Sequence, residues 1–290
     1  MTELDTDIRP EWLTRSAWPW TIRRLTTDRG PIAYTETGSG PVLLFVHAGM
    51  WSFIWRDLIA ELSRDHRCIT LDAPGNGMSP RTDATEIGVE PASAAVGALI
   101  DHLDLRDITI VMHDLGGPAA IGAAAAQPHR IARIAAVNTF AWRPTTRFLR
   151  FALAVMGSAA MRWADVVTGW LPAATATKIG VARHWDAESR TVFRRGMTRA
   201  GRNATHLYFA SARRSPRLFD EIEAALSGSL RGRPVMTVFG RNNDYFGFQP
   251  EWRTRFPTAR QHVLDGGNHF PMCDDPRAVA EWIREWMTAT

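Results

Sequence analysis

The stretch that most constrains the fold of this chain is residues 108–118, Ile-Thr-Ile-Val-Met-His-Asp-Leu-Gly-Gly-Pro. Its β-branched and apolar residues predict a buried strand, and the Ala-rich residues 119–127 predict a helix directly after it. Asp114 stands at the apex between them, where Gly116 and Gly117 permit a tight turn because glycine has no Cβ to clash. The positive end of the helix suits a carboxylate. The stretch therefore predicts an elbow that presents Asp114 as a nucleophile; the alternative is an Asp that only caps the helix.

Strand-like and helix-like runs alternate along much of the chain, with short loops between them. This rhythm predicts an α/β fold with a mostly parallel, doubly wound sheet. Residues 1–30, with three tryptophans, are expected to form an irregular lead-in that packs its aromatic rings on the sheet. The remaining expected strands are residues 30–36, 42–46, 68–72, 131–137, 234–239 and 260–264, and the remaining expected helices are 56–62, 91–103 and 276–287.

Residues 140–230 lack strand-like runs and are rich in Ala, Arg, Met and Trp. We predict a helical cap subdomain here, inserted into a core domain formed by residues 1–139 and 231–290. The apolar stretch 148–171 is interrupted by Arg150, Arg162 and Asp165, so it is not expected to span a membrane.

Composition narrows the classes of function. The 290 residues are 45% hydrophobic and 22% charged, and the net charge is only +4, with the basic residues scattered. No basic stripe indicates a nucleic-acid partner, and no membrane partner is expected. Cys68 and Cys273 lie too far apart in sequence to indicate a disulfide framework or a metal site. The first 15 residues lack a signal-peptide pattern, so we expect a cytoplasmic protein. We further expect that it binds a small-molecule substrate and needs no cofactor.

Three polar residues are expected at the ends of buried strands. Asp114, Asp244 and His269 occur in the chain order nucleophile, acid, base, and the carboxyl ends of parallel strands meet at one edge of a sheet. A carboxylate can displace a leaving group from a saturated carbon and form an ester. His269, oriented by Asp244, is then expected to activate a water that attacks this ester.

The attack on the ester creates an oxyanion that needs hydrogen-bond donors. We expect them from the backbone N–H groups of Leu115 and of Gly49 or Met50. His113, next to the nucleophile, is expected to be structural and to pack under the elbow.

Several motifs together carry a resemblance to a known family. They are Trp51-Ser-Phe followed by Arg56, Asp72-Ala-Pro-Gly-Asn-Gly-Met-Ser79, His113-Asp-Leu-Gly-Gly-Pro118, Asn138-Thr-Phe-Ala-Trp142, and Gly267-Asn-His-Phe270 before Asp274-Asp-Pro276. Over nearly its whole length the chain resembles a haloalkane dehalogenase-type α/β-hydrolase. The resemblance implies carbon–halogen hydrolysis through an alkyl ester on Asp114. The expected substrate contacts are Trp51, Trp142, Tyr208, Phe246 and Phe270.

The chain departs from this family at three points. Leu115 follows the nucleophile where the family has a halide-binding Trp, and the loop at His47-Ala-Gly lacks the Asn of His-Gly-Asn. Both usual halide donors are therefore missing. Asp244 lies four residues after Gly240 where three is usual, which puts Asn243 in the expected position. We predict Asp244 as the acid because only a carboxylate stabilises a histidinium by its charge.

Two other functions remain open. An epoxide hydrolase shares the Asp nucleophile but usually needs two tyrosines in the cap, and residues 140–230 contain only Tyr208, which could act with His184 or His206. A binding protein that has lost turnover is the second alternative, although the complete triad disfavours it. The identity of the substrate and the oligomeric state stay open.

Overall fold

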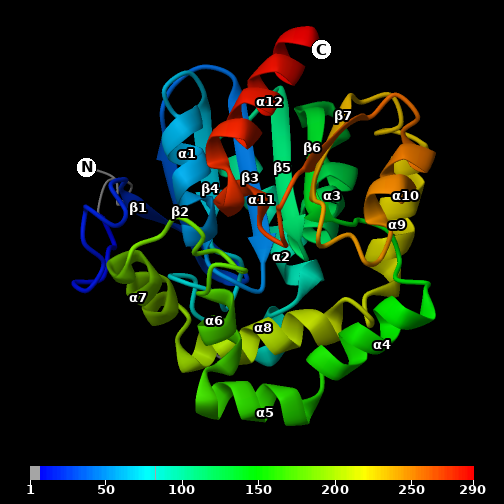
Figure 1. Ribbon diagram of the computed structural model, residues 1–290. Helices are drawn as coiled ribbons and strands as arrows, with labels where there is room; N and C mark the ends of the chain where they lie inside the picture. The colour runs from blue at the N-terminus through cyan, green and yellow to red at the C-terminus, as the bar shows by residue number, and fades with distance from the viewer. Residues whose placement is uncertain (1–6, 82) are drawn as a thin grey trace.

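The computed structural model describes residues 7–81 and 83–290, and its centre is a single eight-stranded sheet (Figure 1). The strand order is β1-β2-β4-β3-β5-β6-β7-β8; the neighbours from β4 to β8 pair in parallel, while β1–β2 and β2–β4 are antiparallel. The predicted α/β fold with a mostly parallel sheet is thus confirmed. The strands are β1 (Ile22–Thr27), β2 (Gly30–Thr37), β3 (Val42–Ala48), β4 (Arg67–Leu71), β5 (Ile108–Asp114), β6 (Ile131–Thr139), β7 (Val235–Gly240) and β8 (Arg260–Leu264).

The expected irregular lead-in is wrong in one respect, because it contains β1. This edge strand pairs with β2 from Ile22 opposite Thr35 to Thr27 opposite Gly30. Its sequence, Ile-Arg-Arg-Leu-Thr-Thr, is too polar to stand out as a strand, since only one side of it is covered. Trp18 packs its ring into the core as expected, whereas the lead-in residues 1–6 lie outside the described residues.

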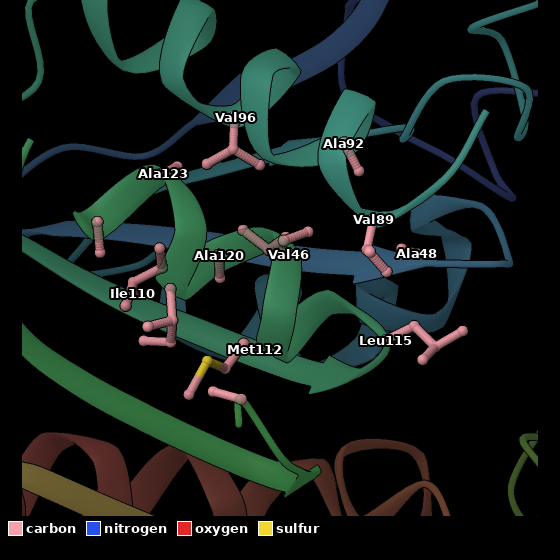
Figure 2. Packing of buried hydrophobic residues seen from close by; sticks show 14 of the residues in the cluster. Val46, Ala48, Val89, Ala92, Val96, Ile110, Met112, Leu115, Ala120 and Ala123 are labelled. Carbon is pink, nitrogen blue, oxygen red and sulfur yellow. The ribbon is translucent and has the colours of Figure 1, made fainter. Parts of the chain in front are cut away.

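Helices cover both faces of the sheet, and the side chains of β3 alternate between them as a strand requires. Leu44 and Val46 pack toward α2 and α3, and Figure 2 shows Val46 in this layer; Leu43 and Phe45 pack toward α1 and α12. The elements that flank the strands are η2 (Ser52–Trp55), α1 (Arg56–Leu62), η3 (Ala84–Glu86), α2 (Val89–His102), α3 (Gly116–Ala126), η4 (Pro128–Arg130), α10 (Phe248–Arg255), α11 (Pro271–Asp274) and α12 (Pro276–Ala289).

All helices between β6 and β7 belong to the stretch that was expected to be a helical insert. Among them, α4, α5, α6 and α8 lie beyond one end of the strands, whereas α9 packs on α3 (Figure 1). The division into core and cap at residues 140 and 230 stays a prediction. Within the described residues, no helix is long and apolar enough to cross a membrane. The helices are α4 (Arg147–Met156), α5 (Ala159–Thr168), α6 (Trp170–Thr175), α7 (Ala187–Gly196), α8 (Arg199–Ser211) and α9 (Pro216–Ser227).

Candidate active site

Asp114 lies at the apex of the turn between β5 and α3, in a strained backbone conformation. Its φ of 49° is in the left-handed region, which a non-glycine residue adopts only where the surroundings enforce it. The chain is packed closely just after this turn: a Cβ on Gly116 would overlap the backbone carbonyl of Val46, and one on Gly117 would overlap that of Phe140. The two glycines therefore let α3 pack against β3 and hold Asp114 at the carboxyl edge of the sheet.

His269 faces the carboxylate of Asp114 from the loop that follows β8. Its Nε2 lies 3.3 Å from Asp114 Oδ2, an ion pair when His269 is protonated. Burial on its own would raise the pKa of Asp114, but the hydrogen bond and the positive charge of His269 outweigh it and lower that pKa to about 2. Asp114 is therefore ionised near neutral pH, as a nucleophile must be.

The residue that holds His269 on its other side is Asn243, which contradicts the expectation of Asp244. Asn243 Oδ1 lies 2.8 Å from His269 Nδ1. The carboxylate of Asp244 instead accepts hydrogen bonds from the N–H groups of Phe248, at 2.7 Å, and Gln249, at 3.1 Å. It lies at the N-terminus of α10, whose unpaired N–H groups and dipole stabilise a negative charge. The spacing after Gly240 indicated Asn243, and the prediction of Asp244, which was based on its charge, is wrong.

Asn138, at the end of β6, is a positioning residue that the sequence analysis missed. Its Nδ2 donates to the backbone carbonyls of Asn268, at 2.7 Å, and His269, at 2.9 Å, and its Oδ1 accepts from the N–H of Gly240 at 3.1 Å. With a φ of 38°, it is the second strained non-glycine residue at the site. One side chain thus ties β6 to both loops that carry the histidine and its partner. The available signal was its place directly after the strand expected at residues 131–137.

His113 and His47 form a buried layer under the site, in agreement with the structural role expected for His113. His113 Nε2 lies 2.8 Å from the carbonyl oxygen of His269, so this nitrogen carries the proton and donates. His113 Nδ1 then accepts from His47 Nδ1, 3.1 Å away. Burial lowers the pKa of His47 to about 4 and that of His113 well below its usual value, which keeps both rings neutral. His113 fixes the backbone of His269 without entering the cavity.

The three backbone N–H groups expected to stabilise the oxyanion differ in whether they already donate a hydrogen bond. The N–H of Gly49 donates to Asn76 Oδ1 at 3.0 Å, so the expectation of Gly49 as a donor is wrong. Within the described residues, no hydrogen bond is recorded from the N–H of Leu115 or Met50. Parallel pairing sets Ala48 beside Asp114, which brings the Met50 loop next to the elbow. Leu115 and Met50 remain the predicted pair.

A cavity of about 280 Å³ opens over Asp114 and His269. Its walls are mostly hydrocarbon, and polar side chains are few. Phe246 is the one expected substrate contact among its lining residues. The lining residues are Asp114, Leu115, Asn138, Phe140, Leu149, Ala152, Leu153, Met156, Phe209, Phe239, Asn243, Tyr245, Phe246, Phe248 and His269.

The other four expected substrate contacts do not line this cavity. Trp51 is buried and donates from Nε1 to the carbonyl of Phe193 at 3.1 Å. Trp142 packs edge-on against Trp252. Tyr208 is fully buried and donates its hydroxyl proton to the carbonyl of Pro74 at 2.8 Å.

Phe270, the fourth of them, packs against the rings of His113 and His269 and supports the base from behind. The helix register that selects Leu149, Leu153 and Met156 for the cavity depends on how α4 docks over the sheet. No local pattern in the sequence encodes that docking.

Comparisons with known proteins find relatives that match most of the chain. The model of the alpha/beta hydrolase family matches residues 43–282. Haloalkane dehalogenase 2 of Mycobacterium tuberculosis is 26% identical over 280 residues, which cover 92% of this chain and 95% of that protein. A cis-3-alkyl-4-alkyloxetan-2-one decarboxylase of Shewanella oneidensis is 26% identical over 291 residues, covering 94% of this chain and 90% of that protein.

Solved structures show the same fold. Haloalkane dehalogenase DbeA from Bradyrhizobium elkani superimposes with a TM-score of 0.78 at 21% identity, covering 93% of this chain and 99% of that one. The epoxide hydrolase CorEH superimposes with a TM-score of 0.76 at 17% identity, covering 93% and 99%.

Proposed function

Because this chain belongs to the alpha/beta hydrolase family, we propose that it hydrolyses a carbon–halogen bond through an ester formed on Asp114. The observation that carries the proposal is an ionised carboxylate, with a pKa of about 2, at the apex of the elbow and facing a hydrocarbon-lined cavity. An apolar cavity excludes water and leaves the carboxylate free to attack a saturated carbon. His269 lies beside it to complete the reaction.

In the first step, an oxygen of Asp114 attacks the carbon that carries the leaving group. The new C–O bond forms as the carbon–halogen bond breaks, and the halide leaves with the bonding electrons. The product is an alkyl ester of Asp114 and a free halide, with no proton transferred. The cavity orients the alkyl chain for in-line attack through side chains such as Leu149 and Phe246.

In the second step, His269 takes a proton from a water molecule through Nε2 while Nδ1 donates to Asn243 Oδ1. The hydroxide attacks the carbonyl carbon of the ester, and the N–H groups of Leu115 and Met50 stabilise the oxyanion. The intermediate then expels the alkoxide, which takes the proton from the imidazolium of His269 and leaves as an alcohol. The carboxylic acid left on Asp114 releases its proton to solvent, so that the carboxylate and the neutral imidazole are both restored. Asn243 orients the imidazole but brings no negative charge to the imidazolium, so we expect this step to limit turnover.

Because the two usual halide donors are missing, the leaving group must depart as a stable anion without help from a side chain. Leu115 is apolar, and the hydroxyl of Tyr208 is engaged with Pro74 outside the cavity. An epoxide oxygen leaves as a strongly basic alkoxide and needs an acid to protonate it, whereas a halide does not. Tyr208, the acid expected for epoxide opening, is therefore poorly placed, which supports the halide.

One observation favours epoxide opening as a second candidate. Tyr245 lines the cavity, although its side chain is 74% exposed. Its hydroxyl could protonate an epoxide oxygen as Asp114 attacks the ring carbon. If this is the reaction, Tyr245→Phe should slow diol formation on the order of 10²-fold. Tyr208→Phe is the matched control and should leave the rate unchanged.

The test is turnover of a panel of bromoalkanes, terminal epoxides and a dialkyl oxetan-2-one, with halide, diol and carbon dioxide all monitored. We expect halide and alcohol in equal amounts from the bromoalkanes. Diol as the main product, lost in Tyr245→Phe, would replace the halide proposal with the epoxide one. Binding of every panel member without any turnover would make the chain a binding protein and would reject both enzymatic proposals.

A further inference from the structure

Exposed apolar side chains are concentrated on two helices of the insert. Within the described residues, eight large hydrophobic side chains are exposed, and six of them lie between residues 148 and 179. Spacings of three and four residues put those of each helix on one side of it. We call this surface the α4–α5 face: Phe148, Phe151 and Val155 on α4 with Trp163 and Val167 on α5. Phe151 is 66% exposed and Trp163 is 70% exposed.

The fold uses little of this surface. The opposite side of α4, with Leu149 and Leu153, lines the cavity, and both helices pack on α8. The α4–α5 face therefore points away from α8, and α5 is the outermost helix on that side of the molecule (Figure 1). Exposed apolar patches of this kind mark surfaces that contact a partner.

The charged side chains of the segment that carries the face are nearly all basic. Residues 144–185 contain a single acidic residue, Asp165, and its buried side chain lies 3.2 Å from His206 Nε2. Arg183 pairs with Asp274. Within the described part of the chain, no ion pair is recorded for the other basic side chains of this segment, Arg147, Arg150, Arg162 and Lys178.

The exposed aromatic rings and the unpaired basic side chains together indicate what kind of partner the face binds. Aromatic side chains next to unpaired basic ones are typical of segments that lie in the interface of a bilayer with anionic lipids. A second copy of the chain fits less well, because two such faces would bring arginines against arginines. We propose that the α4–α5 face docks on an anionic phospholipid bilayer, with Phe151 and Trp163 inserted between the headgroups. The proposal departs from the expectation of no membrane partner but is compatible with the absence of a membrane-spanning helix in the described residues, and it does not rest on the proposed reaction.

The docked face adjoins the cavity. Phe148 packs on the ring of Phe246, a cavity-lining residue, with ring centroids 5.2 Å apart. Tyr245 is both exposed and part of the lining. An apolar molecule dissolved in the bilayer would therefore reach the cavity past α4 with little exposure to water.

The test is co-sedimentation of the full chain with vesicles of phosphatidylcholine, alone or mixed with phosphatidylglycerol. Binding should require the anionic lipid and fall as salt is raised. Arg147→Gln and Arg150→Gln should each weaken it about fivefold, the factor that corresponds to the loss of one basic residue near the surface. Phe151→Ser combined with Trp163→Ser should weaken it about tenfold or more, since both rings lose burial in the interface.

Matched controls change exposed residues elsewhere. Arg253→Gln on α10 and Val263→Ser on β8 should leave vesicle binding unchanged, and thermal unfolding should show that every variant is folded. No binding to anionic vesicles at low salt would overturn the proposal, as would equal losses in the controls. Vesicle binding that survives Phe151→Ser/Trp163→Ser, while sedimentation shows that this variant breaks a dimer, would assign the face to a second copy instead.

Discussion

The nucleophile and the base reach the same cavity from two differently built regions. Asp114 ends a central strand, β5, and α3 follows at once, so regular hydrogen bonding and two glycines fix it. His269 lies in an irregular loop after β8, and its partner Asn243 lies in another after β7. Side chains hold these loops, chiefly Asn138 and His113. The difference teaches that the elbow is rigid by its backbone, while the base is positioned by a few polar contacts that single substitutions can remove.

The largest effect is expected at the elbow. Asp114→Asn should lower turnover on the order of 10³-fold or more, because the amide is a poor nucleophile and the ester cannot form. Glu223→Gln on α9, outside the cavity lining, is the control and should leave the rate unchanged. Halide release should be followed with a bromoalkane. If Asp114→Asn turns over at the normal rate, Asp114 is not the nucleophile.

A smaller effect on stability and turnover is expected at Asn138, whose side chain holds the loop that carries His269. Asn138→Ala would remove the donor to the carbonyls of Asn268 and His269 and the acceptor of the buried Gly240 N–H. The carbonyl of His269 would keep His113 as a donor, but the N–H of Gly240 would lose its partner, at a cost of about 1–3 kcal/mol in the free energy of unfolding. Turnover should fall as His269 loses its position.

Asn242→Ala, on the exposed loop residue next to Asn243, is the matched control. The test is to measure denaturant unfolding and turnover for both variants. If Asn138→Ala and Asn242→Ala have the same free energy of unfolding and the same turnover rate, Asn138 does not position His269.

Asn243→Asp is expected to increase the activity by changing the side chain that positions the base. A carboxylate at this position would stabilise the imidazolium of His269, so the second step should accelerate by roughly tenfold or more. The acid limb of the pH–rate profile should move to higher pH, because a negative partner raises the pKa of a histidine. Asp244→Ala should not reproduce this change, and should cost only about 1 kcal/mol of stability through the loss of a cap on α10. A slower reaction in Asp244→Ala than in Asn243→Ala would restore Asp244 as the partner of His269.

The smallest effect concerns pH and stability. The pKa of Asp114 is lowered from 3.8 to about 2 in the folded chain, so its ionised form is favoured by folding. Its contribution to stability is present above about pH 4 and is lost as pH falls toward 2. The free energy of unfolding of Asp114→Asn should therefore change less between pH 5 and pH 3 than that of the unmodified chain. Parallel curves would mean that Asp114 has an ordinary pKa.

The same contrast explains which features could be predicted from the sequence. Hydrophobic runs predict the buried strands, and the two glycines predict the elbow at Asp114, because both signals act locally in the sequence. β1 was missed because an edge strand needs little apolar sequence. The partner of His269 was misassigned because charge was preferred to spacing, and Asp244 satisfies its charge at a helix N-terminus. The cavity walls depend on how α4 docks over the sheet, which no local pattern records.

The most direct test of the covalent mechanism is the mass of the peptide that contains Asp114 in the His269→Phe variant after exposure to a bromoalkane. Formation of the ester needs only the carboxylate, whereas its hydrolysis needs the imidazole. The mechanism predicts one equivalent of released bromide and a stable gain in mass of one alkyl group on this peptide. Continued turnover in His269→Phe, or bromide release with no alkyl group on the Asp114 peptide, would contradict it.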